Sequence, residues 1–329
     1  MNTTFIITGG AGRAVCSIPA FEKYHKLNPD DDFTIIVHGW DMIFWSHPML
    51  QDRVFNASQK GLFEAVIKNN KVVMPEPYHV HEFFNEKISL VEAFDVAINN
   101  TNDHSDLKRE GYLYLTRYER KGARQFINEL KQKQNKKLCV MTHPFGSGTE
   151  MINGLPHDDT SRSIEPEDYY EIAKHLHKNS VVLYASQEMF KRKDDNITVS
   201  FDGTHPTLPY YRLFMALTSE CDYFVGCDSV GQHIARAFGK KGLVLMGATG
   251  DTCFSYPEHF KIYRNGIPKY FPWRLAEPDA MFAARMNDGM MELSQEALQE
   301  IKTIIDNDLS PTKNPSTISP ESDTGFLYD

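Results

Sequence analysis

The chain has 329 residues, 41% of them hydrophobic and 24% charged, and a formal net charge of −9 at pH 7. This composition excludes a disordered chain, suffices for two domains, and argues mildly against a nucleic-acid partner while leaving small anionic ligands open. Because no stretch approaches the roughly 18 apolar residues of a membrane span and no basic leader precedes the first strand, we expect a cytoplasmic protein without an integral membrane segment.

The chain begins with the pattern of a strand over 4–7, a glycine-containing turn over 8–12 and a helix that ends near Leu27. A glycine loop after a first strand lets the backbone approach a ligand closely. The pattern therefore predicts a ligand-facing loop at Gly10 and Gly12.

The same turn also opens dinucleotide-binding folds, so a dehydrogenase is one alternative, and Tyr170 with Lys174 has the spacing of a dehydrogenase pair. Two features count against it. Val15 stands where the third glycine would let helix pack on strand. The second strand, predicted over 33–37, ends in His38 rather than in an acid for the ribose hydroxyls.

No pattern in the sequence indicates a complete metal site. After a strand predicted over 71–74, His79 and His81 would point to one side if their segment is extended, which leaves a histidine metal pair open, but no third ligand accompanies them. A helix is predicted over 85–97.

The cysteines are odd in number and lack metal-ligand spacing, so we expect free, buried thiols at Cys16, Cys139, Cys221, Cys227 and Cys253.

The segment 108–137 is markedly basic and carries interleaved tyrosines. Phosphate neutralisation with base stacking is one interpretation, and a solvated helix with long lysine side chains is the more usual one. Its polar end predicts the domain boundary, which divides the chain into domains over 1–135 and 136–308 and a mobile tail over 309–329.

The second half opens with a strand over 138–142, which runs into a loop that contains His143, Gly146 and Ser147. Arg162 follows in the next loop, and Glu188 comes after a strand predicted over 181–184. An exposed helix start explains Glu188 equally well.

The most informative stretch runs from Cys221 to Thr252. A short apolar strand over 223–226 is followed by Asp228 and Ser229, and Ser229 is a good N-cap for a helix over 231–238. The free N–H groups at such a helix start attract anions, and His233 lies one turn further on. A plain helix cap is the alternative for Asp228 and Ser229.

This stretch resembles the donor-binding segment of the heptosyltransferase-like glycosyltransferases, which are similar to glycosyltransferase family 9. Asp228, Ser229 and His233 match its Asp-Ser/Thr-Gly and histidine positions, and Thr249 and Asp251 match a following Gly-Pro-Thr-Asp-like loop. Val230 and Ala248 replace the family glycine and proline.

The resemblance extends over roughly residues 3 to 270 and implies roles elsewhere in the chain. It places the loop after His143 near the donor pyrophosphate, makes Arg162 the substitute for a family lysine, and makes Glu188 a nucleoside contact. In the first loop the family has a Gly-Asp pair whose aspartate is a candidate base, whereas here Arg13 follows Gly12. Arginine does not accept a proton at neutral pH, so Asp41 is the speculative replacement.

The implied fold is α/β of the GT-B type, with two Rossmann-like domains facing across a cleft. The implied activity is transfer of a sugar from a nucleotide-diphosphate sugar to a hydroxyl of a glycan or lipid-linked glycan, inverting and without metal or cofactor. The alternatives are a viral DNA-base glycosyltransferase and a non-catalytic sugar-nucleotide binder. The expected catalytic residues are Arg13, Asp41 and His233, with Gly10, Gly12 and Arg13 on the acceptor side and His143, Gly146, Ser147, Arg162, Glu188, Asp228, Ser229, Gly231, His233, Thr249 and Asp251 around the donor.

Overall fold

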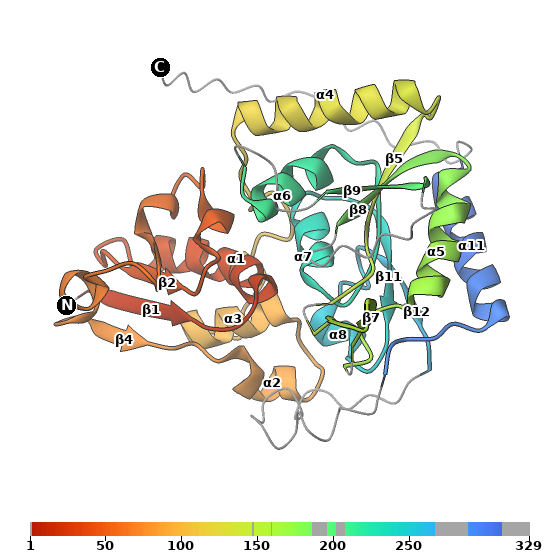
Figure 1. The fold of residues 1–329 in the computed structure, drawn as a ribbon. Helices are drawn as coiled ribbons and strands as arrows, with labels where there is room; N and C mark the ends of the chain where they lie inside the picture. The colour runs from red at the N-terminus through yellow and green to blue at the C-terminus, as the bar shows by residue number, and fades with distance from the viewer. Residues whose placement is uncertain are drawn as a thin grey trace.

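The computed structural model of the protein describes residues 2–146, 148–158, 160–185, 196–201, 208–266 and 289–310. These residues form two parallel β-sheets with helices on their faces (Figure 1). The strand order is β3–β2–β1–β4 in the first sheet and β12–β11–β10–β5–β8–β9 in the second. We call residues 2–99, built on the first sheet, the first lobe, and residues 117–310, built on the second, the second lobe. The predicted α/β class with two Rossmann-like units is confirmed.

The first lobe has an aromatic core between its sheet and α1. The ring of Phe5 on β1 lies 5.2 Å from that of Phe21 on α1 and 6.1 Å from that of Phe33, centroid to centroid. The strands are β1 (Thr3–Ile7), β2 (Thr34–Val37), β3 (Val54–Asn56) and β4 (Lys71–Val73). The helices are α1 (Ala11–Leu27), α2 (His81–Phe84) and α3 (Leu90–Asn99), with the short η1 (Asp41–Phe44), η2 (Gln51–Arg53), η3 (Phe63–Ile67) and η4 (Pro77–His79).

The second lobe buries both faces of its sheet, as expected for parallel strands. Val140 packs with Ile172 and Ile301 on one face, and the next residue, Met141, packs with Phe214 on the other. The sheet strands are β5 (Leu138–His143), β8 (Ser180–Ala185), β9 (Thr198–Phe201), β10 (Tyr223–Cys227), β11 (Gly242–Met246) and β12 (Lys261–Arg264), and β6 (Glu150–Ile152) forms a hairpin with β7 (Leu155–His157). The helices are α4 (Arg117–Lys133), α5 (Pro166–His177), α6 (Tyr210–Glu220), α7 (Val230–Ala237), α8 (Asp251–Phe254) and α11 (Gln295–Leu309).

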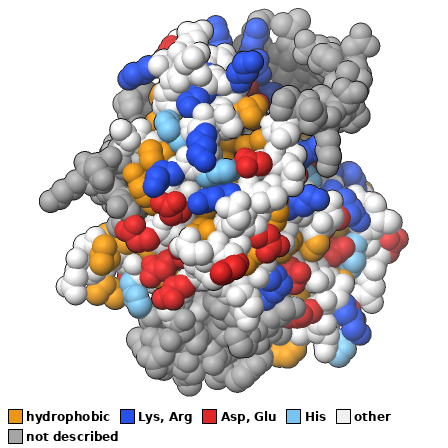
Figure 2. Space-filling model, turned by 90° about the vertical axis from the view of Figure 1, so that its right-hand side faces the viewer, with side chains coloured by type: hydrophobic (Ala, Val, Ile, Leu, Met, Phe, Trp, Pro, Cys, Tyr) orange, Lys and Arg blue, Asp and Glu red, His pale blue; other side chains and the backbone are white. Residues whose placement is uncertain are grey.

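The outer face of the second lobe, formed by α5 and α11, mixes acidic and basic side chains (Figure 2). Glu171 on α5 lies 2.7 Å from Lys174 and 3.5 Å from Lys302 of α11, and His175 lies 2.8 Å from Asp306. Alternating charges of this kind are typical of a solvated surface. In the described ranges no helix combines the length and apolarity needed to cross a bilayer.

The basic segment forms α4, which packs on α6 along the top of the second lobe in Figure 1. Several of its cations are neutralised at close range. Glu220 lies 2.8 Å from Arg124 and 3.3 Å from Arg120, and Asp222 lies 2.8 Å from Lys131. This pairing favours the solvated-helix interpretation over a nucleic-acid surface. The domain boundary at residue 135 stays a prediction, and residues 311–329 of the tail lie outside the described residues.

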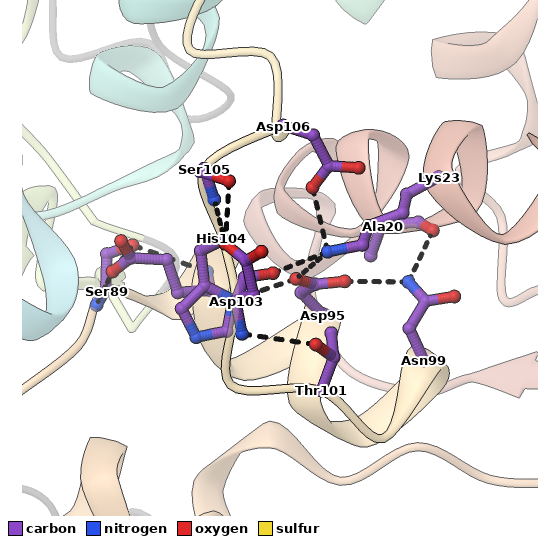
Figure 3. A network of polar contacts seen from close by, with 11 residues as sticks. Ala20, Lys23, Ser89, Asp95, Asn99, Thr101, Asp103, His104, Ser105 and Asp106 are labelled. Carbon is purple, nitrogen blue, oxygen red and sulfur yellow. Dashed lines mark hydrogen bonds and ion pairs between the residues drawn. The ribbon is translucent and has the colours of Figure 1, made fainter. Parts of the chain in front are cut away.

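A buried polar network fastens α1 to α3 and to the segment that follows α3 (Figure 3). Asp95, fully buried on α3, lies 3.1 Å from Nζ of Lys23, 2.8 Å from Nδ1 of His104 and 2.8 Å from Nδ2 of Asn99. Lys23 also pairs with Asp106 at 2.8 Å. Because buried charges are tolerated only when paired, this network holds α1, the helix behind the glycine loop, in place.

One buried arginine joins the two lobes. Arg212 on α6 is 1% exposed and forms a bidentate pair with Glu119 of α4, with N···O distances of 2.7 and 2.6 Å. Its third nitrogen donates to the carbonyl oxygens of Met42 and Trp45 at η1 of the first lobe, and of Tyr114 between the lobes. A single guanidinium therefore fixes η1, α4 and α6 relative to one another.

One predicted helix start is wrong, and one conformation that the sequence left open is not adopted. The helix predicted from residue 85 begins at Leu90, because Ser89 and Glu92 form a capping box there. The segment around His79 and His81 is not extended, since His79 ends η4 and His81 begins α2. All five cysteines are free and buried, as predicted. Among the described residues no group of three or more His, Cys, Asp or Glu side chains is arranged to hold a metal ion.

Candidate active site

Each sheet has one point at which its connections diverge, and ligands of parallel sheets bind beyond the strand ends at such points. In the first sheet this point lies between β1 and β4, and in the second between β5 and β10. Gly10 lies in the loop after β1 and Glu76 follows β4, while His143 ends β5 and Asp228 follows β10. The topology thus brings four segments that are distant in the sequence to the carboxyl ends of the two sheets.

Both points open into one cavity of about 420 Å³ between the lobes, which we call the cleft. The first lobe contributes its glycine loop and η4, and the second contributes the ends of β5 and β10 and the start of α7. The described residues that line it are Gly10, Ala11, Gly12, Arg13, Tyr78, Leu90, His143, Phe145, Gly146, Thr149, Glu150, Pro156, Arg162, Tyr211, Asp228, Ser229, Val230, His233 and Phe254.

A wider hollow of about 1100 Å³ lies beside the β6–β7 hairpin, but its chemistry is different. Its described lining contains no lysine or arginine and includes four carboxylates, those of Glu165, Glu167, Asp168 and Glu292. Burial and the neighbouring acids raise the pKa of Glu165 and of Asp168. Such a surface repels phosphate groups, so the cleft is the better candidate for an anionic ligand.

Asp228 is the most buried charged side chain of the cleft, at 2% exposure. Its carboxylate accepts hydrogen bonds from Thr249 Oγ1 at 2.7 Å and Gln232 Nε2 at 3.1 Å. Burial raises the pKa of Asp228, and the nearby Arg162 opposes that rise. Asp228 therefore ties the end of β10 to α7 and to the loop after β11, and it gives Arg162 a counter-charge.

Ser229 occupies the N-cap position of α7 but does not act as a cap. Its side chain makes no capping hydrogen bond, and Ser229 lines the cleft. The first N–H groups of α7 are therefore not bonded to the Ser229 side chain. The helix start and the hydroxyl can face the same ligand.

Asp158, a buried acid, fixes the loop that carries Arg162. Asp158 accepts hydrogen bonds from the Thr160 backbone N–H at 2.8 Å and from the hydroxyls of Thr160 and Ser163, and Ser163 Oγ accepts the Gly146 N–H at 2.8 Å. Arg162 Nε donates to Thr160 Oγ1 at 3.1 Å. Burial disfavours its charge, but Asp228 and Asp158 outweigh this and raise the pKa of Arg162. The guanidinium is thus a fixed positive charge at the cleft.

His143 and Gly231 are in tight contact. A Cβ added to Gly231 would lie 2.7 Å from His143 Nδ1 and 2.9 Å from Cγ. Burial lowers the pKa of His143 to about 4, so its ring is neutral at pH 7. Gly231 therefore lets the start of α7 approach the end of β5, which shapes the cleft floor rather than contacting a ligand directly.

We expect Gly231→Ala to lower the free energy of unfolding by roughly 1–3 kcal/mol, because the new methyl group overpacks a rigid ring that is itself packed on Phe214. Urea unfolding measures this. The matched control is Gly122→Ala on α4, where nothing lies within 4 Å of the added Cβ and the change should stabilise by about 0.5–1 kcal/mol. Equal effects of the two substitutions would contradict the contact.

His233 faces the glycine loop of the first lobe. A Cβ added to Gly12 would lie 3.1 Å from Cδ2 and 3.5 Å from Nε2 of the His233 ring. On the other side of the ring, His233 Nδ1 lies 2.7 Å from the Tyr256 hydroxyl. Burial, aided by Arg236, lowers the pKa of His233 to about 3. The cleft therefore holds a neutral imidazole between α1 and α7.

Arg13 lines the cleft from the first lobe and is engaged with its own neighbours. Its terminal nitrogen lies 3.0 Å from Glu76 Oε2, and its guanidinium carbon lies 4.9 Å from the centre of the Tyr78 ring. Glu76 also accepts the Tyr78 backbone N–H at 3.1 Å. The glycine loop and η4 are thereby joined across the first divergence point, and a carboxylate stands beside the arginine.

Nine of the predicted site residues line the cleft, and the other predicted residues that the structure describes do not. Asp41 is not among the lining residues, and its carboxylate accepts a hydrogen bond from Asn56 at 2.7 Å, because the chain turns into η1 directly after β2. The Thr249 hydroxyl donates a hydrogen bond to Asp228, and the carboxylate of Asp251 lies 3.5 Å from Nη1 of Arg264. Ser147 and Glu188 lie outside the described residues. The predicted residues that line the cleft are Gly10, Gly12, Arg13, His143, Gly146, Arg162, Asp228, Ser229 and His233.

Sequence reasoning missed Tyr78, which lines the cleft, and it missed three residues that support the cleft from behind its lining, Glu76, Asp158 and Tyr256. Glu76 lies between two prolines after β4 and Tyr78 directly follows the second, at the carboxyl edge of the sheet, and that position was an available signal. Asp158 and Tyr256 lie in irregular segments without periodicity. Nothing in the local sequence distinguishes them from other loop residues.

The comparisons with known proteins concern the fold. A family 9 glycosyl transferase from Veillonella parvula matches 93% of this chain and 98% of its own, with a TM-score of 0.64 at 11% identity. The E. coli heptosyltransferase WaaC, solved with ADP, matches 94% of this chain and 100% of its own, with a TM-score of 0.55 at 12% identity. TibC of enterotoxigenic E. coli, an iron-containing dodecameric glycosyltransferase, matches 94% of this chain and 77% of its own, with a TM-score of 0.56 at 11% identity.

No protein-family model and no curated protein sequence matches the chain. The structural likenesses confirm the predicted resemblance in fold to family 9 heptosyltransferases and the GT-B arrangement. At these identities they establish the fold, and the activity has to be argued from the cleft.

Proposed function

We propose that the protein is a glycosyltransferase that moves a sugar from a nucleotide-diphosphate sugar to a hydroxyl acceptor. The observation that carries this is a single cleft in which the divergence points of two parallel sheets meet, with Arg162, the start of α7 and His233 on its second-lobe side. Fixed positive charge and N–H groups at one place suit a diphosphate. Similar folds have been solved with ADP and ADP-heptose analogues, which supports the donor class.

On the donor side, the chemistry is stabilisation of a leaving diphosphate. As the bond between the sugar and the diphosphate breaks, negative charge grows on the phosphate oxygens. Arg162 and the N–H groups at the start of α7 are already oriented, so they offset that charge without reorganisation. The Ser229 hydroxyl can donate in addition. We propose that these groups suffice for a metal-independent, inverting transfer.

On the acceptor side, the family base position holds Arg13, which cannot take the proton of an attacking hydroxyl. The carboxylate beside it is Glu76, 3.0 Å from the guanidinium, with a side chain that is 34% exposed. We therefore propose Glu76 in place of Asp41 as the base. Arg13 would orient this carboxylate, and glycan and lipid-linked glycan hydroxyls are the proposed acceptors.

The test of the donor site is a thermal-shift series with nucleoside diphosphates and their sugars. A ligand present at 100 times its Kd stabilises the native state by about 2.7 kcal/mol. We expect such a shift with the wild-type protein and its loss in Asp228→Ala and Asp228→Asn. Asp41→Ala, a carboxylate outside the cleft, is the control that keeps the shift. A full shift in both Asp228 variants would place the donor elsewhere.

Turnover then separates glycosyl transfer from the alternatives. Release of nucleoside diphosphate with a glycan acceptor supports the proposal. Donor binding without release for any acceptor would select a non-catalytic sugar-nucleotide binder. Transfer to hydroxylated DNA bases, with an affinity that falls steeply with salt, would select DNA modification.

A further inference from the structure

Three buried side chains from both lobes meet behind the cleft. The Tyr256 hydroxyl, in the segment after α8, lies 2.7 Å from His233 Nδ1 on α7 and 3.6 Å from Cys16 Sγ on α1. The exposures of Tyr256 and His233 are 2% and 4%, and that of Cys16 is zero. Because no water reaches such a cluster readily, its few protons must satisfy its few acceptors internally.

The chemistry of the three groups selects one direction for these hydrogen bonds. A phenol is a good donor and an imidazole nitrogen a good acceptor, whereas a thiol is weak in both roles. Tyr256 therefore donates to His233 Nδ1, which matches the short 2.7 Å contact, and Cys16 donates weakly to Tyr256. The reverse direction would place the phenol proton on the sulfur, its poorest acceptor.

Two neighbours reinforce this direction. The Arg236 guanidinium carbon lies 4.1 Å from the centre of the Tyr256 ring, and a cation over a phenol strengthens its O–H as a donor. Burial raises the pKa of Cys16 to about 12, so the thiol keeps its proton. With Nδ1 accepting, the single proton of a neutral His233 sits on Nε2. That nitrogen is on the ring edge that faces Gly12 and the cleft.

We propose that Tyr256 is a positioning residue that fixes the tautomer of His233, so that the imidazole presents an Nε2–H donor to the cleft. As a donor, His233 cannot take the proton of an attacking hydroxyl. It donates a hydrogen bond to an anionic oxygen instead, and this consequence rests on the proposed function. The tautomer itself is a property of the free protein and does not rest on it.

Nitrogen-15 NMR of protein labelled at histidine reads the tautomer directly. The His233 signals are assigned by their loss in His233→Gln. We expect protonated Nε2 and bare Nδ1 in the wild-type protein, with a mixture of tautomers in Tyr256→Phe. The control is Tyr223→Phe, which removes a buried hydroxyl bonded to Asp308 at 2.7 Å and should leave His233 unchanged. Protonated Nδ1 in the wild type, or an unchanged ratio in Tyr256→Phe, would overturn the proposal.

Nucleoside diphosphate binding tests the consequence of the tautomer for the cleft. Tyr256→Phe should weaken nucleoside diphosphate binding about twofold for an equal mixture of tautomers, because the apparent Kd rises in inverse proportion to the fraction of molecules that present the Nε2–H donor. Tyr223→Phe should bind as the wild type does. If no nucleotide binds the wild-type protein while the NMR result stands, the proposed function fails and the tautomer assignment survives.

Discussion

Arg162→Ala is expected to lower kcat/KM for the glycosyl donor about 10²- to 10³-fold, the usual effect of removing one preorganised donor to a developing negative charge. The reason lies in how the guanidinium is held. Asp158, Thr160 and Ser163 fix the loop, and Asp228 supplies the counter-charge, so the charge is in place before the diphosphate departs. Steady-state release of nucleoside diphosphate is the measurement.

Arg162→Lys separates charge from geometry in that result. Lysine keeps the positive charge but loses the planar fork that binds two phosphate oxygens, so it should recover only part of the activity. Lys121→Ala, on the exposed face of α4, is the control for loss of a remote cation. A kcat/KM for Arg162→Ala within about threefold of the wild-type value would show that the diphosphate does not bind beside this residue.

The second-lobe side of the cleft was predictable from the sequence because its residues are close together in the chain. Asp228, Ser229 and His233 lie within six residues after β10, and a strand end followed by a helix start brings them to one edge of the sheet. His143 and Gly146 were predictable for the same reason, since His143 ends the neighbouring strand β5 and Gly146 lies in the loop that follows it. Ser229 illustrates the limit, because N-cap position did not mean a capping hydrogen bond.

The first-lobe side of the cleft was not predictable because its contacts join distant segments. Arg13 meets Glu76 across 63 residues, and Cys16 meets Tyr256 across 240. No local periodicity encodes such pairs. Asp41 is not among the described residues that line the cleft, and its carboxylate accepts a hydrogen bond from Asn56 at 2.7 Å instead. Without Glu76, Arg13 had no carboxylate beside it that the sequence made visible.

The largest loss of stability is expected from Glu119→Ala. This change leaves the Arg212 guanidinium buried without its carboxylate, which typically costs about 3–5 kcal/mol of unfolding free energy. Urea unfolding at pH 7 measures it. Glu119 also caps α4, because Thr116 and Glu119 bond each other's backbone N–H groups. Thr116→Ala removes the cap of α4 but keeps the ion pair, so it should lower the free energy of unfolding by only about 1 kcal/mol. Equal losses for the two variants would mean that the ion pair contributes nothing beyond the cap.

The pH dependence of stability offers an independent check of the same pair. Burial alone would raise the pKa of Glu119, but the hydrogen bonds and charge of Arg212, together with the hydrogen bonds from Thr116, outweigh burial and lower it below 4.5. A carboxyl with a lowered pKa in the folded state stabilises fully above its unfolded pKa, and this contribution is lost as the pH falls through the folded value. In Glu119→Gln the side chain no longer titrates, so its stability should fall less between pH 5 and acid than that of the wild type. Since Arg212 also donates to carbonyl oxygens of η1, parallel acid profiles would imply that these backbone contacts, rather than the ion pair, stabilise the buried guanidinium.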